Sequence, residues 1–287
     1  MNTEQKTVLI TGCSAGSIGD ALAREFKSRG FRVFAASRTL DSMESLAKDG
    51  IETVVLDITS DANVAEARDE ISKRTGGSLD VLVNNAGVAY SSTVADCDMD
   101  KVRWLFEVNV FGHYATTRAF IPLLIKSKAG LVMFNSSLAS LVPIPFNSVY
   151  GASKAAVNLL SDTLRVELAP FGVKVVNLIT GNVASNIGTT HRPKGGLPEN
   201  SIYKPVEETY IKNMEHFQDN AISREVFAKG VVDEAMKQWP STWFWSGNQS
   251  TLVWLMTTFG KRTAFDGMMS KANGFDKLAE IVRAKRS

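Results

Sequence analysis

Three side chains in the middle of the chain have the types and spacing needed to move a proton to or from an oxygen. Tyr150 and Lys154 are four residues apart, so in a helix that begins near residue 148 they share one face. A phenol has a pKa of about 10, and a nearby ammonium group is expected to lower it. Ser137 follows an apolar run and can donate a hydrogen bond to a substrate carbonyl. The trio predicts general acid/base catalysis on a carbonyl or an alcohol.

The elements that would position these residues alternate between short β-branched runs and longer helical stretches. Six runs are predicted as strands: 7–11, 31–36, 52–57, 80–84, 130–135 and 173–179. Apolar residues at three- and four-residue spacing predict helices over 18–29, 41–48, 61–74, 99–126 and 148–168. This alternation predicts a Rossmann-type α/β fold, a doubly wound parallel sheet with helices on both faces.

A glycine-rich segment joins the first predicted strand to the first predicted helix. Its residues are Gly12, Cys13, Ser14, Ala15, Gly16, Ser17, Ile18 and Gly19. Glycines at this place let the backbone turn tightly and approach a pyrophosphate, whose charge meets the N–H groups at the helix start. An ordinary tight turn is the alternative, but the position within a βαβ unit favours dinucleotide binding.

The end of the second predicted strand bears on which dinucleotide is bound. An acidic residue there would bind the ribose 2′-hydroxyl of NAD, whereas an arginine can pair with the 2′-phosphate of NADP. This sequence has Ser37 followed by Arg38. We therefore expect NADP(H) as the cofactor, with a merely solvated Arg38 as the alternative.

Composition and charge exclude several other classes of protein. The chain has 287 residues, of which 44% are apolar and 22% charged, and this excludes a disordered or coiled-coil protein. The net charge of +2 gives no basic field for nucleic acid. Cys13 and Cys97 make no metal spacing, so we expect no metal site and a reducing compartment. The sequence shows no signal-peptide core and no run long enough to span a membrane, which predicts a cytoplasmic protein.

The order of these motifs resembles the short-chain dehydrogenase/reductase family over residues from about 6 to about 185. Asn84 to Gly87 match the family's Asn-Asn-Ala-Gly motif, and Asn109 matches its helix asparagine. The resemblance implies that Ser137, Tyr150, Lys154 and Asn109 form the catalytic group. It also implies that Lys154 holds the nicotinamide ribose and that Asn109 supports a water that resupplies protons.

The loop chemistry and the resemblance together give a set of expected cofactor contacts. In this set Asp57 and Ile58 would contact the adenine, Asn85 to Gly87 the adenosine side, and Val183 the nicotinamide amide. The complete set is Gly12, Ser14, Gly16, Ser17, Ile18, Gly19, Ser37, Arg38, Asp57, Ile58, Asn85, Ala86, Gly87, Tyr150, Lys154, Gly181 and Val183.

Two positions depart from the family pattern. Gly16 and Gly19 are separated by two residues, where the family usually has one, as in a branch that resembles fungal acyl-dihydroxyacetone-phosphate reductases. Thr180 precedes Gly181, where the family usually has Pro-Gly. The second departure puts the stiffness of the nicotinamide-side loop in question.

Two further reactive side chains are expected to have packing roles. His113 follows Asn109 by one helical turn, and a lone helix histidine is more often packed than catalytic. Cys13 lies in the glycine loop, where it can fill space as a small apolar group or be oxidised and block the cofactor.

The alternation of strands and helices ends after residue 179. Residues 185–220 are expected to form a substrate-covering insertion, with a surface excursion as the alternative, and a helix is expected over 222–237. The family frame places a seventh, edge strand at 241–247, so one Rossmann domain would cover 1–247 and a helical extension packed on it 248–287. Four of the five tryptophans lie between residues 239 and 254. They can pack on the sheet or a partner subunit, line the substrate site or, least favoured, contact a membrane.

These features predict an NADP(H)-dependent oxidoreductase that interconverts a ketone and a secondary alcohol on a hydrophobic small molecule. We favour a secondary-metabolite, terpenoid or polycyclic substrate. The alternative is an acyl-dihydroxyacetone phosphate, whose phosphate Arg192 and Lys194 would meet. A non-catalytic NADP-binding scaffold or sensor is disfavoured by the intact catalytic group. Family members commonly pair the helices expected at 99–126 and 148–168 across a two-fold axis, which implies a homodimer or homotetramer.

Overall fold

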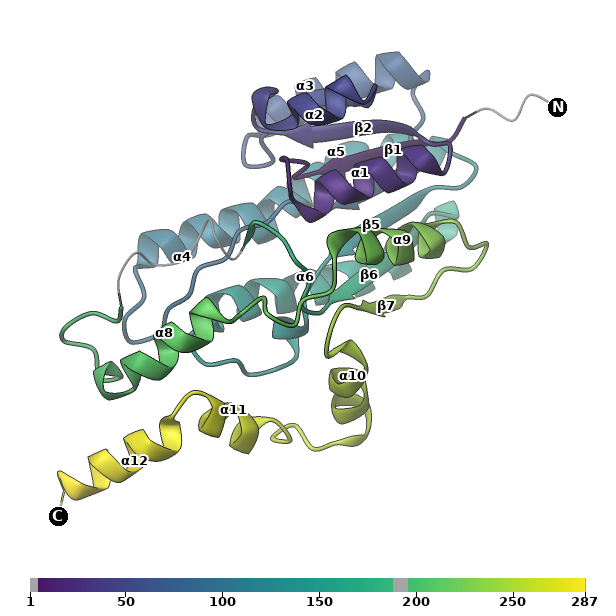
Figure 1. Ribbon diagram of the computed structural model, residues 1–287. Coiled ribbons are helices and arrows are strands. Elements are labelled where there is room, and N and C mark those ends of the chain that lie inside the picture. Colours follow the sequence, from purple (N-terminus) through teal and green to yellow (C-terminus); the bar gives the residue numbers. More distant parts are fainter. Residues whose placement is uncertain (1–4, 188–195, 287) are drawn as a thin grey trace.

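Seven parallel strands form a single sheet in the computed structural model, which describes residues 5–187 and 196–286 (Figure 1). The spatial order is β3-β2-β1-β4-β5-β6-β7, so the direction of winding reverses between β1 and β4. The strands are β1 (Thr7–Thr11), β2 (Arg32–Ser37), β3 (Glu52–Val55), β4 (Val81–Asn84), β5 (Leu131–Asn135), β6 (Lys174–Thr180) and β7 (Trp243–Ser246). The predicted Rossmann-type fold is confirmed. In such sheets the ligand binds beyond the carboxyl ends of the strands at the reversal.

The strands read as apolar runs because helices cover both faces of the sheet. On one face Ile10 packs with Phe26 of α1 (Ile18–Ser28) and Phe227 of α9 (Arg224–Ala235). On the other face lie α3 (Asp61–Thr75), α5 (Gly112–Lys126) and α6 (Ser148–Leu168). Each large side chain buried in these two cores contributes about 1.5–3 kcal/mol.

The long helix predicted over residues 99–126 is interrupted. The structure has α4 (Met99–Phe106), a π-helical turn at Glu107–Phe111 and then α5. The prediction of one continuous helix was therefore wrong at the position of Asn109. The stretch 41–48 is also divided, into a 3₁₀ turn (Asp41–Met43) and α2 (Glu44–Lys48).

The expected insertion contains a helix of its own. A 3₁₀ turn (Lys204–Val206) leads into α8 (Glu207–Glu215), and the chain then enters α9. Arg192 and Lys194, which the sequence offered as phosphate ligands, lie outside the described residues. Two other 3₁₀ turns occur at Leu138–Ser140 and Ala169–Phe171.

Three helices follow β7: α10 (Ser250–Phe259), α11 (Asp266–Ala272) and α12 (Phe275–Ala284). Figure 1 shows them as a yellow run that leaves the edge of the sheet and ends beneath α8. The rings of Trp243 and Trp245 are 5.9 Å apart, so they share one face of β7. Within the described part of the chain, no helix is both long and apolar enough to cross a membrane.

Candidate active site

The catalytic candidates meet beyond the carboxyl ends of β4 and β5. Tyr150 and Lys154 lie on the first two turns of α6, and Ser137 follows β5 by two residues. The Tyr150 hydroxyl is hydrogen-bonded to the Ser137 side chain. The Lys154 Nζ lies 5.7 Å from the centre of the Tyr150 ring and donates to the Asn135 carbonyl at 2.7 Å. The structure thus brings the predicted trio together.

The acid/base balance of this trio differs from the expectation. Burial raises the pKa of Tyr150 to about 12, and the hydrogen bond from Ser137 only partly offsets this. The predicted lowering by Lys154 was wrong, because enclosure of the hydroxyl disfavours the phenolate more strongly than its neighbours favour it. Burial also lowers the pKa of Lys154 to about 8. At neutral pH Tyr150 therefore holds its proton and Lys154 its charge, which suits proton donation to a carbonyl oxygen.

Asn109 is aimed at the loop that follows β4. Its Oδ1 accepts the Val88 N–H at 2.8 Å, and its Nδ2 donates to the Val88 carbonyl at 2.9 Å and to Ser153 Oγ at 3.1 Å. A Cβ on Gly87 would lie 3.3 Å from Asn109 Oδ1 and 3.5 Å from Lys154 Nζ, so this glycine lies against both side chains. Because Asn109 lies in the π-helical turn, the break in the helix lies at the site, where such turns are frequent.

A chain of side-chain hydrogen bonds, which the sequence did not reveal, joins the ends of four strands. Thr180 Oγ1 donates to Asn135 Oδ1 at 2.6 Å, and Asn135 Nδ2 donates to Asn85 Oδ1 at 2.8 Å. Asn85 Nδ2 in turn donates to the Thr11 carbonyl at 2.8 Å. Thr180 stands where the family usually has proline, and its hydroxyl ties β6 to β5. The only signal in the sequence was the position of each residue at or beside the end of a predicted strand.

The glycine loop has the conformation that its composition predicted. Gly12 and Gly16 have φ angles of +76° and +75°, which L side chains rarely adopt. A Cβ on Gly19 would overlap the Gly12 carbonyl oxygen. Ser17, one of the two residues between Gly16 and Gly19, is the N-cap of α1: its Oγ accepts the Asp20 N–H at 3.1 Å and donates to the Gly12 carbonyl at 3.0 Å.

The loop and the first turn of α1 fit a pyrophosphate. Four of the loop's N–H groups donate within the protein, those of Cys13, Ala15, Gly16 and Ser17. The N–H groups of Ser14, Ile18 and Gly19 donate to no described residue. These free donors at a helix N-terminus are the groups that bind phosphate oxygens.

The adenosine end of the expected site lies beside the end of β2. Ser37 Oγ lies 3.2 Å from Ser14 Oγ and accepts from Ser42 Oγ at 2.9 Å, while Arg38 is exposed. Ser42 was missed by the sequence analysis because it lies outside the glycine loop and the strand.

The adenine contacts expected of Asp57 and Ile58 fall at the end of β3. Asp57 Oδ1 accepts from both the N–H and the hydroxyl of Thr59, at 3.0 and 2.7 Å. Ile58 is buried, and it packs so closely on Gly112 that a Cβ there would lie 2.8 Å from its side chain. One Asp57 oxygen thus serves the loop itself.

The nicotinamide end of the expected site is closed by tight backbone contacts. A Cβ on Gly181 would overlap the Asn248 carbonyl, and the Gly181 N–H donates to the Ser246 carbonyl at 2.7 Å. Val183 is buried and pairs with Ile222. The start of the C-terminal extension therefore borders this end of the site.

His113 and Cys13 are both buried. His113 Nε2 is 2.8 Å from the Ala86 carbonyl, and burial together with the Lys154 charge lowers the pKa of His113 to about 3. A neutral imidazole must donate its Nε2–H there, so this histidine holds the backbone loop and does not act as a base. Burial raises the pKa of the Cys13 thiol to about 12, which favours its role as an apolar filler.

Two clusters of apolar and aromatic side chains pack on the segment between Ser137 and Tyr150. Phe146 has a φ of +61° and packs against the rings of Tyr203, Tyr210 and Phe275 at centroid separations of 5.9, 4.8 and 5.7 Å. We call these four rings the Phe146 cluster. The second group includes apolar residues of the loop after Ser137, of β6 and β7, and of the helices α10 and α11 with the residue before α11: Leu138, Leu141, Val142, Ile144, Ile179, Trp243, Trp245, Val253, Met256, Phe265 and Met269. The tryptophans of β7 thus pack on the loop that begins at Ser137.

The sequence of this chain matches the family model described as short chain dehydrogenase over residues 6–195. The chain belongs to this family. Its members are oxidoreductases with a nicotinamide dinucleotide-binding fold, so the resemblance noted in the sequence is confirmed.

Individual relatives match over more than four fifths of the chain. The short-chain dehydrogenase srdE of Neurospora crassa is 40% identical, over 96% of this chain and 94% of its own. The NADPH-dependent 1-acyldihydroxyacetone phosphate reductase of Schizosaccharomyces pombe is 41% identical, over 82% of this chain and 78% of its own. Among solved structures, a short-chain dehydrogenase from Streptomyces avermitilis has a TM-score of 0.77 at 23% identity, covering 97% of this chain and 98% of its own.

Proposed function

We propose that this dehydrogenase is an NADPH-dependent reductase that converts a ketone on a hydrophobic small molecule to a secondary alcohol. The observation that carries the proposal is the Tyr150 hydroxyl, hydrogen-bonded to Ser137 and beside the Lys154 ammonium. The raised pKa of Tyr150 keeps the phenol protonated at neutral pH, which is the form that can give a proton to a carbonyl oxygen.

Each residue of the site then has a defined task. Ser137 donates a hydrogen bond to the substrate carbonyl as negative charge develops on its oxygen. Tyr150 transfers its hydroxyl proton to that oxygen, and the Lys154 charge favours the phenolate that remains. Lys154 also holds the nicotinamide ribose, and Asn109 supports the water that resupplies the proton. When bound, the nicotinamide supplies the hydride.

The preference for NADPH rests on the end of β2. Arg38 is exposed and directly follows Ser37, whose hydroxyl lies within hydrogen-bond distance of those of Ser14 and Ser42. An arginine and hydroxyl groups are suitable donors for a 2′-phosphate. The S. pombe relative is named as NADPH-dependent, which supports the same choice.

The substrate class is supported by the surroundings of Tyr150. The Phe146 cluster and the tryptophans of β7 pack on the segment between Ser137 and Tyr150, so the surroundings of this segment are largely apolar and aromatic. Such surroundings favour an apolar ligand. We favour a secondary-metabolite, terpenoid or polycyclic ketone. An acyl-dihydroxyacetone phosphate is the second candidate, because a relative named for that reaction is 41% identical. In this proposal residues 1–247 form the catalytic domain and 248–287 an extension that borders its substrate site.

The proposal is tested by following cofactor absorbance with purified protein and a panel of ketones of both classes. NADPH and NADH are compared in parallel, and Arg38→Ala is the control for cofactor choice. We expect turnover of apolar ketones with NADPH, and a loss of the NADPH preference in Arg38→Ala. Turnover with NADH alone would contradict the cofactor assignment, and turnover of acyl-dihydroxyacetone phosphate alone would contradict the favoured substrate class.

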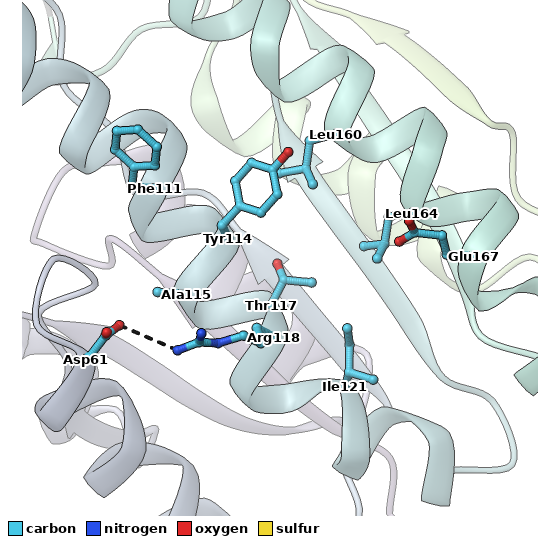
Figure 2. A pocket seen from close by; sticks show the side chains of 10 residues that line it. All are labelled: Asp61, Phe111, Tyr114, Ala115, Thr117, Arg118, Ile121, Leu160, Leu164 and Glu167. Carbon is cyan, nitrogen blue, oxygen red and sulfur yellow. Dashed lines mark ion pairs between the residues drawn. The ribbon is translucent and has the colours of Figure 1, made fainter.

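We also propose that the protein is a homo-oligomer that pairs through α5 and α6. A groove of about 410 Å³ runs between these helices, lined by Phe111, Tyr114, Leu160 and Leu164 among others (Figure 2). Phe111 and Tyr114 are 56% and 52% exposed, which is costly for large side chains in a monomer. Light scattering after size-exclusion chromatography should give a multiple of the chain mass, and Tyr114→Glu should reduce it. A monomeric wild-type protein would contradict the proposal.

A further inference from the structure

Two side chains, one from the start of the insertion and one from α9 after it, hold the glycine loop, which we call the phosphate loop from here on. Arg224, the first residue of α9, donates from Nη1 to the Gly16 carbonyl at 2.7 Å. Asn186 Nδ2 donates to the neighbouring Ala15 carbonyl at 2.8 Å. Arg224 lies beyond residues 6–195, over which the family model matches, and it reaches the loop because α9 packs along α1. Nothing in the sequence marked this residue.

The loop itself offers less to an anion than its glycines suggest. The Gly16 N–H donates to Asp20 Oδ2 at 2.9 Å, so that amide is occupied. Asp20 also places a largely buried carboxylate at the N-terminus of α1, next to the cradle for the pyrophosphate. Arg24 pairs with Asp20 at 2.9 Å and also with Asp49, so its charge is already matched on the outer side of α1. A further cation at the loop would balance the negative charge of a bound pyrophosphate.

Arg224 has the position and the unused donors for this task. A Cβ on Gly16 would lie 3.6 Å from its Nη1, so the guanidinium stands directly over the loop. Its Nε pairs with Glu225 at 3.1 Å, and the side chain is 35% exposed. A guanidinium has five N–H donors, and those on Nη2 meet no acceptor among the described residues.

We propose that Arg224 is a phosphate-binding residue, whose guanidinium is held by the Gly16 carbonyl and donates to the pyrophosphate of the dinucleotide. This inference rests on the proposed function, since it needs a dinucleotide in the α1 cradle. It gives α9 a role in cofactor binding besides packing on α1. The two ends of the dinucleotide's adenosine half would then each meet one arginine, Arg38 at the 2′-phosphate and Arg224 at the pyrophosphate.

The test measures ligand binding by calorimetry on the full chain, without turnover. The ligands are NADPH, ADP-ribose, which has the pyrophosphate but no 2′-phosphate, and adenosine 2′-monophosphate, which has no pyrophosphate. In Arg224→Ala we expect the Kd of NADPH and of ADP-ribose to rise about tenfold, as for loss of a charged hydrogen bond, and that of adenosine 2′-monophosphate to stay unchanged. Arg38→Ala should show the opposite pattern on the two adenosine ligands.

Two further variants distinguish direct binding of phosphate by Arg224 from an effect of Arg224 on the shape of the loop. Arg224→Lys keeps the charge and should recover part of the ADP-ribose affinity. Val226→Ala changes an exposed residue on the same helix turn whose apolar side chain cannot pair with Arg224, and it should not raise the Kd of ADP-ribose. Thermal unfolding of each variant checks that the fold is retained.

Two results would overturn the inference. One is an equal loss of affinity for all three ligands in Arg224→Ala, which would mean that Arg224 only shapes the loop. The other is an unchanged affinity for ADP-ribose in the same variant. A wild-type protein that binds neither NADPH nor NADH would instead overturn the proposed function itself. A wild-type protein that binds NADH but not adenosine 2′-monophosphate would contradict only the NADP preference, and ADP-ribose compared with adenosine would still test Arg224.

Discussion

The phosphate loop and the Phe146 cluster lie at the same edge of the sheet but are built in opposite ways. The loop is held by backbone geometry: glycines with positive φ, an N-cap and bonds to neighbouring carbonyls. The Phe146 cluster is held by four aromatic rings from the loop before α6, the insertion and the C-terminal extension. A backbone cradle suits a ligand that never changes, whereas side-chain packing can be altered one residue at a time. The comparison predicts that changes in the two regions affect different kinetic constants.

The largest expected effect is on the chemical step, which needs the cofactor held at one region and the substrate held at the other. Tyr150→Phe removes the proton that the substrate oxygen receives, so kcat should fall by about 10²- to 10⁴-fold. The Kd of NADPH should stay within about twofold, because the ring and its packing remain. Stopped-flow turnover and fluorescence titration measure the two quantities. Near-normal turnover with bound cofactor would show that another group donates the proton.

A methyl group added to the phosphate loop should weaken cofactor binding and leave the Phe146 cluster unchanged. In Gly19→Ala the new Cβ overlaps the Gly12 carbonyl oxygen, so the loop must shift at a cost of about 1–3 kcal/mol. We expect a higher Kd for NADPH and a lower free energy of unfolding, measured in urea. Gly267→Ala is the matched control, since nothing lies within 4 Å of its Cβ. Equal behaviour of the two variants would contradict the role of Gly19.

The pH profile of reduction tests the charge of Lys154, which lies on α6 outside both regions. The pKa of Lys154 is lowered to about 8, so the ammonium is charged below this pH and loses its proton above it. We therefore expect kcat/KM for ketone reduction to fall about tenfold per pH unit above pH 8. Tyr150, with its pKa raised to about 12, stays protonated throughout. A basic limb that begins near pH 10 would contradict this assignment.

The smallest effect is expected in the aromatic region. Phe275→Ala opens the Phe146 cluster from the side of α12, so the KM for a large apolar ketone should change several-fold while the Kd of NADPH does not. Phe259→Ala, at an aromatic position of the same extension that is 76% exposed, is the control. A change in NADPH affinity in Phe275→Ala would erase the distinction between the two regions.

The same contrast explains what could be predicted from the sequence. The parallel sheet and the glycine loop follow from local patterns, because strand periodicity and positive φ are encoded within a few residues. The catalytic trio was found because its members follow one another along the chain at fixed spacing. Arg224 and Asn135 were missed, and Thr180 was noted without its hydrogen bond, because their partners lie far away in sequence and are paired only by the fold. The pKa of Tyr150 was misjudged because burial, which no motif reveals, dominates it.

The hydroxyl of Thr180 affects which substitutions the turn after β6 can tolerate. Where the family pattern has a proline before the glycine of this turn, this protein has a hydrogen bond from Thr180 to Asn135 that continues to Asn85. A proline ring stiffens a turn through a single residue, whereas this chain of hydrogen bonds depends on several side chains. A substitution at any of positions 180, 135 and 85 therefore interrupts this chain, and a proline introduced alone at position 180 would remove the hydrogen bond to Asn135.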